Sequence, residues 1–153
     1  MKNIRKNIRL AALLGAALLV AGCSSVSLKA DDVPMSMAMG AGAILSGTNS
    51  VPANASAATG TSSVWVAADK SVTGKVTVSG LKPTAAHIHM AAASANGPVV
   101  VPLTKMSDEL FTVPEGARLT DAQYVSYMAG NLYVNVHSAA YPGGEIRVHL
   151  SPK

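Results

Sequence analysis

Apolar and polar residues alternate along short segments of the chain from residue 44 onward, the pattern of half-buried β-strands. In segment 71–79, valines and a glycine at even positions alternate with threonine and lysine between them. Comparable segments cover 44–47, 61–68, 85–90, 99–103, 110–113, 133–137 and 145–150, and turn-forming residues such as Asn96-Gly97-Pro98 separate them. The pattern predicts an all-β domain, a Greek-key β-sandwich or barrel of about seven to eight strands.

One segment carries a helix signal instead. Thr120 and Gln123 stand at the spacing of a capping box, in which each residue's side chain satisfies the other's backbone amide. Gly130 is placed where a helix would end. We therefore expect one short helix near residues 120–129.

The N-terminal segment has the composition of a bacterial secretory signal. Residues 1–9 contain four basic residues, and an uninterrupted apolar run follows from Leu10 to Val20. About a dozen apolar residues are too few for a membrane span, which needs roughly 20. Leu19-Val20-Ala21-Gly22-Cys23 resembles a lipobox, so we predict a signal peptide at 1–22 and lipidation of Cys23. Ser24, in place of an aspartate, favours the outer membrane over the inner membrane of the envelope.

Residues 23–43 are rich in small residues and show no sustained apolar period, which predicts a flexible tether before a domain at 44–153. Met35, Met37 and Met39 alternate within this tether. Their thioethers can bind a soft ion such as Cu(I). The alternative is that these methionines belong to an ordinary linker.

Charge and cysteine content narrow the function classes. Of the 12 Lys and Arg residues, four lie in the predicted signal peptide, and the remaining eight balance the eight Asp and Glu residues. No basic surface is then expected for nucleic acid. Cys23 is the only cysteine, and its lipidation would leave no thiolate for a disulfide or a metal.

The four histidines are the candidate metal ligands. Alternate side chains of a strand share a face, so His87 and His89 point together. His137 and His149 lie in two further predicted strands, on the faces opposite the valines and isoleucine that suit a core. We predict a metal site formed by His87, His89, His137 and His149. The alternative is that these are structural or merely exposed histidines.

Four segments resemble the CHRD (chordin-type) domain family. They are Ala85–His89, Asn96–Leu103, Gly130–His137 and Pro142–Arg147, within a similarity that covers about residues 44–150. Two positions depart from the family pattern: Met90-Ala91 replaces a glycine, and Val148-His149-Leu150 replaces a Gly-Gln-Leu ending.

The order of His87, His89 and His137 is also similar, more loosely, to the copper ligands of Cu,Zn superoxide dismutase, which implies a copper-only site. Both resemblances imply a Greek-key sandwich, superoxide dismutase-like or immunoglobulin-like.

All-imidazole ligation suits copper, nickel or zinc, and copper binds most tightly in the Irving–Williams order. Cu(II) is therefore the expected ion, with zinc as the alternative. We expect a lipid-anchored envelope protein that binds copper for storage, tolerance or delivery. The sequence does not identify a protein partner. Whether the protein is an enzyme is open too, with binding favoured over catalysis. Two alternatives remain, a copper-only superoxide dismutase-like enzyme and a non-metal module that binds a protein or glycan.

Overall fold

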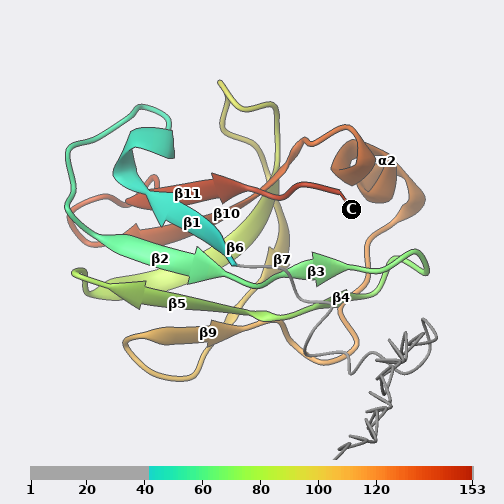
Figure 1. Cartoon of the computed structure of the whole chain (residues 1–153), viewed down its shortest axis with the longest axis horizontal. Coiled ribbons are helices and arrows are strands. Elements are labelled where there is room, and N and C mark those ends of the chain that lie inside the picture. Colours follow the sequence, from blue (N-terminus) through green and yellow to red (C-terminus); the bar gives the residue numbers. More distant parts are fainter. Residues whose placement is uncertain (1–41, 153) are drawn as a thin grey trace, which may run out of the picture. The chain divides into compact units, whose positions relative to one another are not determined.

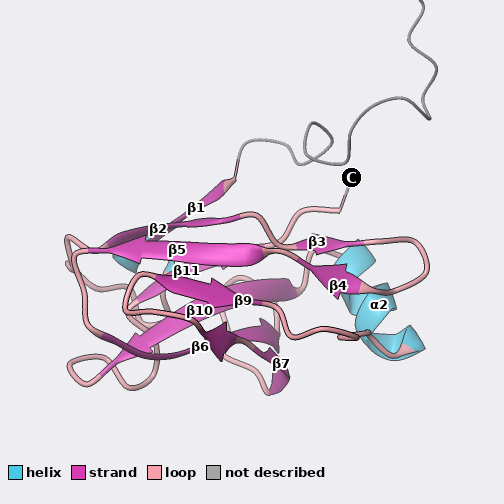
Figure 2. Ribbon diagram, turned by 90° about the horizontal axis from the view of Figure 1, so that it is seen from below, coloured by secondary structure: helices cyan, strands magenta, loops and turns pink. Residues whose placement is uncertain are grey.

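The computed structural model describes residues 42–152 (Figures 1 and 2). The predicted signal peptide at 1–22, the lipidation site Cys23 and the tether methionines Met35, Met37 and Met39 lie outside these residues, so they remain predictions. Within 42–152, no helix is long and apolar enough to cross a membrane.

The described chain is almost entirely β-structure, as the alternation predicted. Its strands are β1 Ala43–Ser46, β2 Thr59–Ser62, β3 Trp65–Val66, β4 Val72–Thr73, β5 Lys75–Ser79, β6 Pro83–Met90, β7 Val99–Pro102, β8 Thr104–Lys105, β9 Leu110–Thr112, β10 Leu132–Ser138 and β11 Ile146–His149. The helices are a 3-10 turn, η2 (Gly47–Asn49), and α2 (Asp121–Met128).

Nine strands form one antiparallel sheet in the order β7-β6-β10-β11-β1-β2-β5-β9-β8. Its two end strands, β7 and β8, are consecutive in the chain and are joined at Leu103. The sheet therefore curls until its ends meet, and the backbone amide of Leu103 donates to the carbonyl of Ala86 on β6. The result is a nearly closed, barrel-like sheet, with β3 and β4 pairing as a separate ribbon beside it (Figure 1).

The inside of this sheet is filled by the apolar half of the alternating pattern. Leu45, Ile88, Phe111, Val134 and Ile146 each have 0% exposure and come from five different strands. Their polar neighbours in sequence face away from the core because adjacent strand residues point to opposite sides. The alternation thus predicted the core, and the prediction of an all-β sandwich or barrel is confirmed.

Two predicted strands are interrupted in the structure. Segment 71–79 divides into β4 and β5 at Gly74, whose φ of +123° and close approach to the carbonyl oxygen of Ser63 exclude a side chain. Segment 61–68 divides into β2 and β3 where the backbone amide of Val64 bonds to the hydroxyl of Ser62. These breaks let the chain leave the main sheet and form the ribbon, so more and shorter strands result than predicted.

The helix occurs where its capping signal predicted it. The hydroxyl of Thr120 accepts from the backbone amide of Gln123, and the Gln123 side chain accepts from the backbone amide of Thr120. Gly130, with a φ of +74°, follows the last turn. The prediction of a single short helix near 120–129 is confirmed.

Strand β10 is the key to the site because both of its faces are covered. Leu132, Val134 and Val136 face the core, whereas Tyr133 is 1% exposed and Asn135 is 3% exposed on the opposite face. The β6–β7 loop, residues 91–98, contacts this second face through several hydrogen bonds described below. We call this second face of β6, β10 and β11 the polar face.

Candidate metal site

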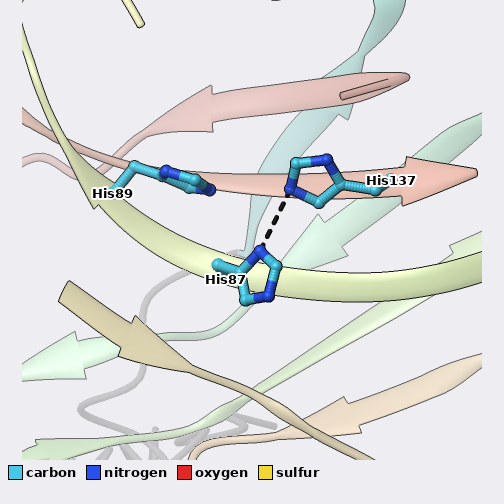
Figure 3. Close-up of side chains that lie close together, drawn as sticks. All are labelled: His87, His89 and His137. Carbon is cyan, nitrogen blue, oxygen red and sulfur yellow. Dashed lines mark hydrogen bonds between the residues drawn. The ribbon is translucent and has the colours of Figure 1, made fainter. Parts of the chain in front are cut away.

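Strand pairing brings three histidines together on the polar face. Strands β6 and β10 are antiparallel neighbours, and their register places His87 opposite Asn135 and His89 opposite Tyr133. His137 lies two residues after Asn135 on β10, so it points to the same side. One nitrogen from each of His87, His89 and His137 lies within 4.8 Å of the others. This cluster can hold a metal ion (Figure 3).

The three rings converge at angles that suit coordination rather than stacking. The centroids of His87 and His89 are 5.4 Å apart with the rings nearly perpendicular, at 81°. Nδ1 of His87 and Nε2 of His137 are hydrogen-bonded at 3.1 Å (Figure 3), and a metal ion bound by both rings would take the place of the proton between them. The nitrogen lone pairs can therefore be directed at one common point, which parallel stacked rings would not allow.

In His89 and His137, the ring nitrogen Nδ1 is hydrogen-bonded to a backbone carbonyl. Nδ1 of His89 is 3.0 Å from the carbonyl oxygen of Gly97, and Nδ1 of His137 is 2.9 Å from that of Pro142. A carbonyl oxygen only accepts, so each Nδ1 carries a proton, and Nε2 is the ring nitrogen that could bind a metal. Metal-binding histidines are commonly oriented in this way.

The second ring nitrogen of His89, Nε2, indicates whether the cluster fits a metal ion. Nε2 of His89 is buried and has no hydrogen-bond partner among the described residues. A buried acceptor left without a partner costs about 1–3 kcal/mol, so such atoms are uncommon in native proteins. A metal ion at the centre of the cluster would satisfy this atom.

Burial favours the neutral forms of His87 and His89 by lowering the pKa of each ring. Burial lowers the pKa of His87 below its ordinary value of 6.5, and the neighbouring His137 and His89 add to the effect. Burial also lowers the pKa of His89, against the opposing effect of the Gly97 carbonyl, with further lowering by His137 and Arg147. Neutral imidazole is the form that binds a metal.

These pKa shifts predict how the metal-free protein responds to acid. His87, His89 and His149 all have a lowered pKa in the folded state, so the unfolded chain takes up protons first as the pH falls below 6.5. The contribution of these histidines to the free energy of unfolding should therefore be complete well above pH 6.5 and decrease as the pH falls below that value. Denaturant unfolding in a chelator at pH 7.5 and 5.5 measures this. An equal stability at both values would contradict the assignment of neutral histidines.

His149 is not brought to the cluster. It lies on β11, with its ring 5.3 Å from Tyr133. Its Nδ1 donates to the carbonyl of Gly130 at 2.9 Å, and its Nε2 accepts from Nη2 of Arg147 at 2.8 Å. The guanidinium cannot give up the proton that it donates to Nε2, so His149, unlike the mutually bonded His87 and His137, offers no lone pair to a metal and is not part of the cluster. The role expected from sequence, a fourth ligand on the site, does not fit this geometry.

Three parts of the site were not anticipated from sequence. The Gly97 and Pro142 carbonyls orient ligand rings, although the sequence marked their segments only as turns. Asn135 holds the second of these turns, because its Nδ2 donates to the carbonyl of Gly143 at 3.1 Å. Arg147, two residues before His149 on β11, has 0% exposure and contacts the loop that carries Gly97. Only the Asn-Gly-Pro and Pro-Gly-Gly spacing hinted that these turns were special.

Comparison with known proteins agrees with the segments noted in the sequence. Neither the curated proteins nor the solved structures contain a match to this chain. A family model, the CHRD domain, matches residues 41–150, which include every strand of the sheet and all four histidines. The chain therefore belongs to the CHRD domain family.

Proposed function

We propose that this protein is a lipid-anchored cell-envelope protein that binds one copper ion through His87, His89 and His137. Its role would be copper storage, tolerance or delivery. The observation that carries this proposal is the buried, unpartnered Nε2 of His89, which faces two further imidazoles in a cluster with all ligand atoms within 4.8 Å.

The donor set supports copper in particular. The cluster contains three imidazoles and no carboxylate, which disfavours magnesium or calcium. Among first-row divalent ions, Cu(II) binds such a set most strongly. Zinc, which accepts three histidines and a water, is the alternative. The three-residue set leaves at least one coordination position for water or for a donor from another molecule, which suits an ion that is delivered or received.

Metal titration tests the proposal directly. The domain at residues 42–153 should bind one equivalent of Cu(II), and His87→Ala/His89→Ala should lose that equivalent because only one ligand remains. His149→Ala should keep the stoichiometry, since both of its ring nitrogens are engaged elsewhere. Retained stoichiometric binding in the double variant would refute the site.

The anchoring part of the proposal has its own test. If Cys23 is lipidated, the full chain fractionates with membranes in a Gram-negative host, and Cys23→Ala moves it to the soluble periplasmic fraction. Membrane association that survives this substitution would contradict lipidation at Cys23.

A copper-dependent dismutase is the enzymatic alternative, and one observation disfavours it. A dismutase needs a cation that attracts superoxide, but Arg147 on the polar face is fully buried and engaged with backbone carbonyls. It cannot steer an anion from solvent. Superoxide consumption by the copper-loaded domain above that of free copper would nevertheless favour this alternative, whereas absence of copper and zinc binding would favour the non-metal module.

A further inference from the structure

Arg147 is an unusual buried charge. Its side chain has 0% exposure, and burial lowers the pKa of its guanidinium. None of the ion pairs among residues 42–152 includes it. A buried cation without a carboxylate is costly unless hydrogen bonds replace its hydration. The partners that replace water here therefore indicate what the side chain holds in place.

Those partners lie mostly in the β6–β7 loop. Nη1 of Arg147 donates to the carbonyl oxygen of Ala95 at 3.0 Å and to Oδ1 of Asn96 at 3.2 Å. Nη2 donates to the carbonyl of Ala92 at 3.3 Å, and to Nε2 of His149. The loop sequence Ala91-Ala92-Ala93-Ser94-Ala95-Asn96-Gly97 has no large side chain that could anchor it by packing. The guanidinium, with its planar set of donors, supplies that anchor instead.

The same guanidinium also contacts the ring of Tyr133, which packs against the proposed ligand His89. Its Cζ lies 3.4 Å from the centroid of the Tyr133 ring, a cation–π contact. The Tyr133 ring stacks on His89, with 5.1 Å between centroids and 8° between planes. Arg147, Tyr133 and His89 therefore share one continuous set of contacts across β11, β10 and β6.

Arg147 contacts both the loop, which carries Gly97, and Tyr133, which bonds to Gly97, and the carbonyl of Gly97 is hydrogen-bonded to His89. The hydroxyl of Tyr133 accepts from the backbone amide of Gly97 at 3.1 Å. The carbonyl of Gly97 accepts from Nδ1 of His89. The loop that Arg147 holds thus carries the one acceptor that sets which nitrogen of His89 is protonated.

We propose that Arg147 is a positioning residue for the metal site. It holds the 92–97 loop and the Tyr133 ring so that His89 keeps its proton on Nδ1 and presents Nε2 to the ion. This inference rests on the proposed function for its metal readout, but the state of His89 in the metal-free protein is independent of any metal. The hydrogen bonds of Arg147 go to the loop and to His149, and none goes to a ring nitrogen of the three proposed ligands.

Substitution of Arg147 tests the proposal. Arg147→Lys keeps the charge but not the planar fork, and Arg147→Met keeps the length alone. In both, the amides of 92–97 should exchange hydrogen faster, and nitrogen NMR of the metal-free protein should show His89 as a mixture of tautomers. Copper should still bind at one equivalent but about 10- to 100-fold more weakly. Ile146→Val, next in sequence but facing the core, is the matched control and should change none of these.

The outcomes separate this proposal from the proposed function. Unchanged affinity and an unchanged His89 tautomer in Arg147→Lys would overturn the positioning role while leaving the metal site intact. A wild-type protein that binds no metal would overturn the proposed function, and the tautomer and exchange measurements would still decide the role of Arg147. If neither Arg147 variant folds, Asn96→Ala, which removes one of its acceptors, should shift the same readouts in the same direction. No shift would overturn the proposal.

Discussion

Gly97→Ala is expected to reduce copper affinity by about 100-fold and to lower the free energy of unfolding by about 2–3 kcal/mol. A methyl group at this position would lie 1.9 Å from the carbonyl oxygen of Met90 and 2.9 Å from Cβ of Ala91. Neither the Met90 carbonyl nor the Ala91 methyl group, which is fixed directly to the backbone, can yield without moving the start of the loop. The loop must therefore shift, and the Gly97 carbonyl leaves Nδ1 of His89. Copper titration and denaturant unfolding measure the two effects.

Gly143→Ala is the matched control for this prediction. Gly143 also lies in a turn whose carbonyls support the site, but no atom lies within 4 Å of where its methyl group would be. Affinity and stability should therefore remain close to those of the wild type. Equal losses in the two variants, or no loss in Gly97→Ala, would contradict the steric argument.

Copper is expected to stabilise the folded domain strongly. A ligand that binds only the folded state at 100 times its Kd adds about 2.7 kcal/mol to the free energy of unfolding. For a domain of this size, that amounts to a rise in Tm of roughly 10 °C. The increase should appear because the three histidines are assembled by strands β6 and β10 only in the folded protein. Thermal unfolding with and without copper, followed by circular dichroism, measures it.

His137→Ala supplies the comparison for the copper effect. This histidine is only half-buried, so its removal should alter the stability of the metal-free domain little while abolishing most of the copper-dependent rise. A rise of the same size in the variant would show that copper acts elsewhere, for example on exposed methionines.

Much of the fold and most of the site follow from local patterns. Alternation predicted which residues of segments 85–90 and 133–137 face the core, and therefore that His87, His89 and His137 face away from it. Capping residues predicted α2, because the hydrogen bonds involved lie within four residues of one another. The break at Gly74 was not predicted, since it depends on the close approach of Ser63 and Val64, about ten residues earlier in the chain.

His149 is a residue whose role could not be predicted from the local sequence pattern. It shares a face with the other histidines, and sequence alone made it an attractive fourth ligand. Strand order decided otherwise: β11 lies on the far side of β10 from β6, so Tyr133 stands between His149 and His89. Arg147, two residues earlier, then occupies the nitrogen that a metal would need.

The sequence by itself determined the β-class of the domain, the faces of its main strands and the histidine pair, because the period of a strand is a property of neighbouring residues. Only the tertiary structure decided that His137 meets this pair, that His149 does not, and that Arg147 is buried beneath a loop. These outcomes depend on the pairing of β6 with β10 and on the path of residues 91–98, which join segments about 50 residues apart. Long-range register of that kind is set by packing of the whole sheet, and no short stretch of sequence contains it.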